Sequence, residues 1–203
     1  MHFDKCQSEF SNINLQKTKE YLYKNILYET EKYYGFKNSR DNLKWLHMVT
    51  NGWFNDQIDH NGRWKMITDR TNNIGKVLDV ASGCGTFVFH GLHNKYKVWG
   101  IEPEEWKVKY YQMKIISADY PKYYLNHVIR GTGEYLPFAD KSFDIVTTYQ
   151  TLEHVQSVKK CIYEMLRVLK PGGILYLKCP GYNCFYEPHY RIPFLPQMNK
   201  NLA

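Results

Sequence analysis

A short glycine-rich loop follows a run of apolar, mostly β-branched residues and carries the first chemical signal in this chain. The run Val77–Val80 leads into Ala81-Ser82-Gly83-Cys84-Gly85, and an apolar run resumes at Phe87. Glycine suits positions where φ is positive or where a ligand approaches the backbone. A helix that begins after such a loop presents unpaired N–H groups. The pattern therefore predicts a strand, a turn and a helix that together cradle a nucleotide-like ligand.

Two acidic residues accompany this loop. Asp79 lies inside the first expected strand, and Glu102 ends a second apolar run 23 residues further on. An acid at about this distance can bind a ribose, because two carboxylate oxygens match a diol. A dinucleotide loop of the G-x-G-x-x-G/A type is disfavoured, because Val88 stands at the third position and its side chain would obstruct close helix–strand packing.

Further motifs follow in the order of a known family. They are Glu134–Phe138, Ser142–Val146, Leu152–Val155 and Leu166–Gly173. Together with the loop and Glu102 they resemble the signatures of class I S-adenosylmethionine (SAM) methyltransferases over residues 75–180. The resemblance implies a Rossmann-like fold, SAM as the methyl donor, S-adenosylhomocysteine (SAH) as the product, and methyltransferase activity.

The resemblance also implies which residues bind the cofactor. These are Asp79, Ala81, Ser82, Gly83, Gly85, Glu102, Thr132, Gly133, Glu134, Tyr149 and Gln150. Asp79 is expected to position the loop and the methionine amine, with capping of backbone N–H groups as the alternative. Ala81 stands where the family more often has glycine, so we expect no positive φ there.

The adenine and sulfonium ends of the cofactor are expected on later segments. Gly133 and Glu134 match the segment whose backbone meets adenine. Thr132 replaces an aspartate that many relatives use for the adenine amine, and its hydroxyl is a substitute acceptor. Tyr149 and Gln150 follow the fourth strand and either line the sulfonium pocket or pack as ordinary residues.

Two histidines are the candidate catalytic residues. His154 follows the fourth strand, where an imidazole can remove a proton from an attacking hydroxyl; a structural or cofactor-side role is the alternative. His189 lies in Glu187–Pro196, which resembles a tail of methyltransferases from bacterial surface-saccharide and related biosynthetic clusters; it binds a hydroxylated substrate or belongs to a packed lid. Methyl transfer requires positioning above all, so a base is optional and no metal is expected.

Alternating strand and helix patterns predict the elements that position these residues. Strands are expected at 76–81, 97–101, 127–130, 143–149 and 173–179, and helices at 13–34, 41–50, 60–71, 85–93, 104–118 and 156–169. This alternation predicts an α/β fold with a doubly wound, mostly parallel sheet. We expect a helical cap or extension in 1–74, the SAM-binding core in 75–180, and a tail or substrate lid without a clear strand in 181–203. The two strands that close the family's sheet are then missing or replaced.

Composition narrows the class of protein further. The chain has 203 residues, 43% of them hydrophobic, and a net charge of +7 spread along its length. No apolar run approaches the roughly 20 residues of a membrane span. The N-terminus lacks a secretory pattern, and the five cysteines include no C-x-x-C pair, which favours a reduced, cytoplasmic protein.

The leading interpretation is a methyltransferase that acts on a small molecule, at the oxygen of a hydroxylated metabolite or saccharide. The positive charge and the Tyr/Lys-rich segments leave an RNA- or protein-directed methyltransferase as an alternative. A non-catalytic SAM-binding module is the third interpretation. The oligomeric state stays open.

Overall fold

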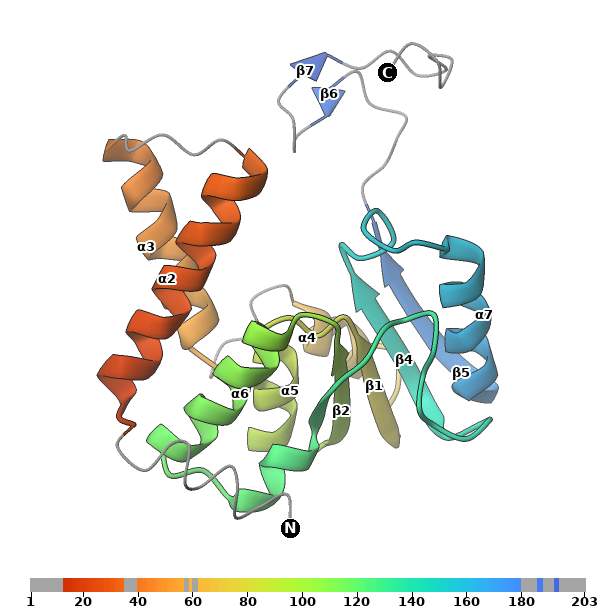
Figure 1. Ribbon diagram of the computed structural model, residues 1–203. Helices are drawn as coiled ribbons and strands as arrows, with labels where there is room; N and C mark the ends of the chain where they lie inside the picture. Colours follow the sequence, from red (N-terminus) through yellow and green to blue (C-terminus); the bar gives the residue numbers. More distant parts are fainter. Residues whose placement is uncertain are drawn as a thin grey trace.

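A five-stranded, wholly parallel sheet forms the centre of the computed structural model, which describes residues 13–34, 40–56, 59, 62–179, 186–187 and 192–193 (Figure 1). The strand order is β3-β2-β1-β4-β5. The strands are β1 (Lys76–Val80), β2 (Lys97–Glu102), β3 (Val128–Arg130), β4 (Phe143–Tyr149) and β5 (Leu169–Lys178). Chain order reverses between β1 and β4, and ligands of open parallel sheets bind at the carboxyl ends of the strands at such a point.

Helices cover both faces of this sheet. Alternate residues of β1 point to opposite faces, so Val77 and Leu78 belong to different apolar clusters. The cluster around Val77 includes residues from α4 (Arg63–Thr68), α5 (Thr86–His93) and α6 (Glu105–Ser117). The cluster around Leu78 includes residues from α7 (Val158–Val168). The expected doubly wound α/β architecture is confirmed.

Two N-terminal helices lie outside these layers, where the first packs against α6 and the second packs against the first (Figure 1). They are α2 (Leu15–Tyr34) and α3 (Arg40–Phe54). Leu22 of α2 and Leu46 of α3 are fully buried and share one apolar cluster with Tyr110 of α6 and Cys84 of the glycine-rich loop. The helices before the sheet are therefore tied directly to the loop.

The largest difference among the expected strands of the sheet lies at the start of β5. That strand begins at Leu169 rather than at residue 173, because it pairs with β4 on both sides of an irregularity. Phe143 pairs with Leu169 and Ile145 pairs with Ile174, so the segment between them, which holds Gly172 at φ 76°, bulges out of the ladder.

The remaining differences from the expected elements concern α4, a 3-10 helix and the tail. Helix α4 is much shorter than the expected helix over 60–71, and a 3-10 helix, η1 (Lys122–Asn126), was not expected. In the tail, β6 (Tyr186–Glu187) and β7 (Ile192–Pro193) form an antiparallel pair where no clear strand was expected. Among the described residues, no strand pairs with the outer edge of β5.

Candidate functional site

The loop between β1 and α5 turns sharply through three residues with positive φ. These residues are Ala81 at 59°, Gly83 at 60° and Gly85 at 77°. The expectation that Ala81 avoids positive φ is wrong. Alanine has the smallest side chain after glycine, and the strained conformation is held because Ser82 N donates a hydrogen bond to Ile101 O at 2.9 Å.

The two glycines of this loop serve different purposes. A Cβ atom on Gly85 would lie 2.4 Å from Tyr111 Cδ2, so Gly85 allows the loop to pack against α6. A Cβ atom on Gly83 would meet none of the described residues within 4 Å. The outer face of Gly83 is therefore open space in which a ligand can approach the backbone, as the cofactor assignment requires.

Glu102 holds the loop in place at Gly83. The residue is 2% exposed; its Oε2 accepts a hydrogen bond from Gly83 N at 2.7 Å, and its Oε1 accepts one from Glu104 N at 3.1 Å. Burial raises the pKa of Glu102, and the nearby Lys107 ammonium opposes this effect. Each carboxylate oxygen has a second lone pair, so the geometry fits a ribose diol.

Asp79 has a partner that the sequence analysis missed. The guanidinium of Arg63 donates to both of its carboxylate oxygens, Nη1 to Oδ1 at 2.6 Å and Nη2 to Oδ2 at 3.2 Å. The guanidinium also lies 4.2 Å from the ring centroid of Phe87. Burial raises the pKa of Asp79, and Arg63 opposes that shift. Neither interpretation of Asp79 included this ion pair; the available signal was an arginine at the start of the apolar helix that contains Trp64 and Ile67.

The segment expected to meet adenine packs against α7. A Cβ atom on Gly133 would lie 2.6 Å from Cys161 Sγ, so only glycine allows this approach. Glu134 Oε1 accepts hydrogen bonds from Gln156 N at 2.9 Å and from Ser157 N at 3.4 Å. Burial opposes ionisation of Glu134, but the backbone N–H groups outweigh it and lower the pKa. The carboxylate therefore orders the turn before α7, while Thr132 is exposed and forms an isolated bridge with Tyr135.

The remaining candidate residues lie around the end of β4. Tyr149 is its last residue, and its ring centroid lies 5.5 Å from the guanidinium carbon of Arg63. Gln150 follows with φ 53°, a backbone conformation that is strained for residues other than glycine. The side chain of His154 is 63% exposed, which leaves its ring accessible to a substrate. His189 lies outside the described residues.

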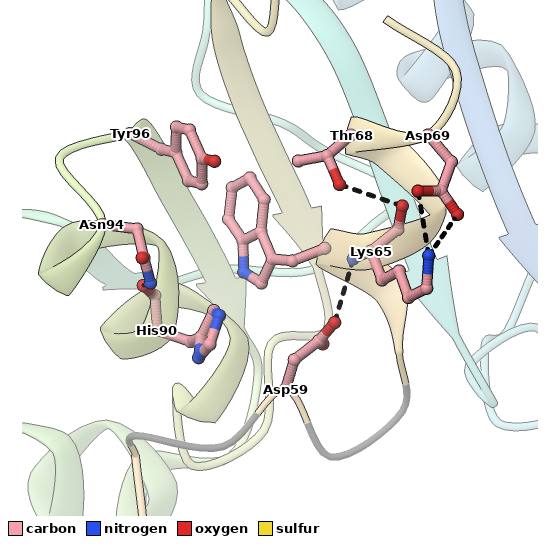
Figure 2. A pocket seen from close by; sticks show the side chains of 8 residues that line it. Asp59, Lys65, Thr68, Asp69, His90, Asn94 and Tyr96 are labelled. Carbon is pink, nitrogen blue, oxygen red and sulfur yellow. Dashed lines mark hydrogen bonds and ion pairs between the residues drawn. The ribbon is translucent and has the colours of Figure 1, made fainter.

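An open pocket of about 360 Å³ lies elsewhere, between α4 and α5 (Figure 2). Its polar side chains bond mainly to one another or to nearby backbone: Asp59 Oδ2 accepts from Lys65 N at 3.0 Å, and Lys65 Nζ donates to Asp69 Oδ2 at 2.8 Å. None of the expected site residues lines this pocket. The residues expected to bind the cofactor instead lie at or just after the carboxyl ends of β1, β2, β3 and β4.

This arrangement of loop, strand-end acids and parallel sheet is that of a class I Rossmann-like fold. A solved protein from Pyrococcus horikoshii OT3, PH0226, has the same fold with a TM-score of 0.51; it is 24% identical, and the match covers 61% of this chain and 60% of that chain.

Residues 78–177 match the family described as "Methyltransferase domain". A demethylmenaquinone methyltransferase of Renibacterium salmoninarum is 35% identical over 116 residues, which are 56% of this chain and 46% of that protein. An uncharacterized methyltransferase of Mycobacterium sp. (strain KMS) is 31% identical over 114 residues, 56% of this chain and 42% of that protein. The chain thus spans less than half the length of these two relatives.

Among the described helices, none combines the length and the apolar character that a membrane crossing needs.

Proposed function

We propose that this chain transfers a methyl group from SAM to a small hydroxylated molecule, at oxygen. The observation that carries the proposal is the open backbone face at Gly83 beside the buried carboxylate of Glu102, with Tyr149 and Gln150 at the neighbouring strand end. The first two features suit the methionine and ribose parts of SAM. The third supports the proposal, because its aromatic and polar groups suit an acceptor that approaches from this strand end.

The relatives favour a small acceptor over a macromolecule. Two of the matching proteins are named for demethylmenaquinone, a small molecule. The acceptor atom in our proposal follows from the hydroxyl-binding groups near the end of β4, Tyr149 and His154. Methyl transfer then needs mainly alignment of the acceptor oxygen, the methyl carbon and the sulfur.

The test is a labelling experiment with SAM that carries a radioactive methyl group. The protein is incubated with phenols, quinols and sugars in one series, and with total RNA and a protein extract in another. Label recovered in a hydroxylated small molecule, and lost in the Glu102→Ala variant, supports the proposal. Label that enters only RNA or protein contradicts it and supports the alternative suggested by the net charge of +7.

A non-catalytic SAM-binding module is the remaining candidate. Tight SAH binding, measured by calorimetry, without label transfer to any acceptor favours this interpretation. Loss of SAH binding in both Glu102→Ala and Gly83→Val, with a folded protein by circular dichroism, would place the binding event at the loop in either case.

A further inference from the structure

The last residues of β4 and β5, Tyr149 and Lys178, form a pair at the carboxyl edge of the sheet. They are direct register partners in the parallel ladder, so their side chains leave the same face of the sheet. Lys178 Nζ lies 3.1 Å from the Tyr149 hydroxyl oxygen and 4.8 Å from the centroid of its ring. Gln150 N donates a hydrogen bond to Lys178 O at 2.8 Å, which fixes the two strand ends relative to each other.

Two cationic side chains lie beside the Tyr149 ring, and they differ in whether a carboxylate neutralises them. Arg63 also faces the Tyr149 ring, but Asp79 neutralises it through the two-bonded ion pair. No ion pair joins Lys178 to a carboxylate within the part of the chain that the structure describes. The hydrogen bond to Tyr149 raises the pKa of Lys178, so the ammonium keeps its charge over the whole neutral range.

Two hydrogen-bond donors therefore meet at one point. The ammonium of Lys178 has three N–H groups and uses one of them on the Tyr149 oxygen. The Tyr149 hydroxyl accepts this bond and keeps its own hydrogen for another acceptor. A cationic donor beside a hydroxyl donor favours a negatively charged oxygen over a neutral one, because charge-assisted hydrogen bonds are the stronger kind.

We propose that Tyr149 and Lys178 bind the oxyanion of an acceptor that has an acidic hydroxyl group, such as a phenol or an enol. The inference rests on the proposed function and names the class of its acceptor. The acceptor loses its O–H proton to water, and its oxygen then attacks the methyl carbon. The carbon–sulfur bond breaks, and its electron pair remains on the sulfur of SAH. The pair favours the reactive, ionised form of the acceptor, so the chain needs no separate general base for this step.

The experiment measures binding of 4-nitrophenol to the SAH-loaded protein, because its phenolate absorbs visible light and its phenol does not. The wild-type protein should bind it and increase its ionised fraction at a pH near the pKa of the free compound. Lys178→Met should weaken the binding by about tenfold or more and abolish the increase in ionisation. Lys178→Arg should retain much of both effects. Tyr149→Phe should weaken the binding by a smaller factor.

Two matched controls distinguish binding at Tyr149 and Lys178 from a general effect of positive charge on the protein. Lys97→Met removes an exposed lysine at the amino end of β2, the opposite edge of the sheet, and should change nothing. The neutral ether 4-nitroanisole has the same ring without an ionisable hydroxyl, so any binding of it should be insensitive to Lys178→Met. Circular dichroism and SAH titration verify that each variant is folded.

The possible results are distinct. Equal 4-nitrophenol binding by wild type and Lys178→Met, equal loss in Lys97→Met, or no binding by the folded, SAH-bound wild type overturns the inference. These results leave the proposed function standing. Selective binding that depends on Lys178, in a protein that transfers no label to any small acceptor, supports the oxyanion site and counts against the proposed function instead.

Discussion

The guanidinium of Arg63 meets both carboxylate oxygens of Asp79, and this ion pair joins helix α4 to the central strand β1 inside the protein. Arg63 is 8% exposed and Asp79 is 0% exposed. A paired charge at such depth is tolerated because its partner replaces the lost hydration. Asp79 lies two residues before Ala81, so the same pair holds the strand end from which the glycine-rich loop begins.

Arg63→Met removes the partner of a fully buried carboxylate. We expect the free energy of unfolding to fall by about 3–5 kcal/mol, because the remaining charge is uncompensated. Urea unfolding followed by circular dichroism measures the loss. The double variant Arg63→Met/Asp79→Asn should recover a substantial part of it, and a double variant as unstable as the single one would contradict this account.

The free energy of unfolding of Arg63→Met should depend on pH differently from that of the wild type. Burial raises the pKa of Asp79, and Arg63 opposes the shift, so its removal raises this pKa further. A raised pKa for an acid means that the native state binds the proton more readily than the unfolded state, and stability then falls as pH rises. Between about pH 7 and about pH 5, Arg63→Met should therefore regain stability relative to wild type as the pH is lowered. Arg63→Met/Asp79→Asn should show no such gain.

Gly83 and Gly85 should respond differently to the same substitution. Gly85→Ala places a Cβ atom 2.4 Å from Tyr111, and we expect a loss of about 1–3 kcal/mol from overpacking in addition to backbone strain. In Gly83→Ala the new Cβ atom has no neighbour within 4 Å among the residues that the structure describes, so only the strain of about 1–2 kcal/mol applies. Its larger effect should appear as weaker SAH binding in calorimetry. SAH affinity in Gly83→Ala equal to that of wild type would remove Gly83 from the binding site.

Glu102→Gln tests the ribose assignment. The amide oxygen can still accept from Gly83 N, but the side chain can no longer accept from both ribose hydroxyls. We expect SAH affinity to fall by about 10- to 100-fold. Because burial raises the pKa of Glu102, wild-type affinity should also weaken as the pH falls from about 8 to about 5. An equal pH dependence in Glu102→Gln would assign it to another group.

His154→Gln separates catalysis from structure. The side chain is 63% exposed, so the melting temperature should change little. An acceptor with an acidic hydroxyl needs no base, so its turnover should change little; turnover of a sugar hydroxyl, which must lose its proton during transfer, should fall by about 100-fold. SAH affinity should stay constant. Unchanged turnover of the sugar would mean that solvent, and not His154, accepts the hydroxyl proton.

The sheet could be predicted from sequence because its strands are short apolar runs that end in turn residues. The observed β4 has the expected bounds, and β1, β2 and β3 differ from them by one residue. The start of β5 was missed because Pro171 and Gly172 are typical turn residues, yet here they lie in a bulge inside a ladder. The pairing that holds this bulge comes from Phe143, far away in the sequence.

The site was only partly predictable for a related reason. Gly83 and Glu102 belong to local patterns, and the structure places them in contact. Arg63 belongs to no pattern, because its role depends on an ion pair between α4 and β1. Ala81 was misjudged because residue type indicates only which backbone conformations are easy, whereas the bond from Ser82 to Ile101 holds a difficult one.

Cys84 links the glycine-rich loop to the two N-terminal helices. The side chain of Cys84 lies in the glycine-rich loop and is buried with Leu22 and Leu46 of the N-terminal helices. Because they share this buried cluster, we expect the loop and the two helices to open together in local unfolding. A ligand that orders the loop should slow amide hydrogen exchange in α2 and α3 at a distance, so the donor, once bound, would prepare the helices for the acceptor that follows it.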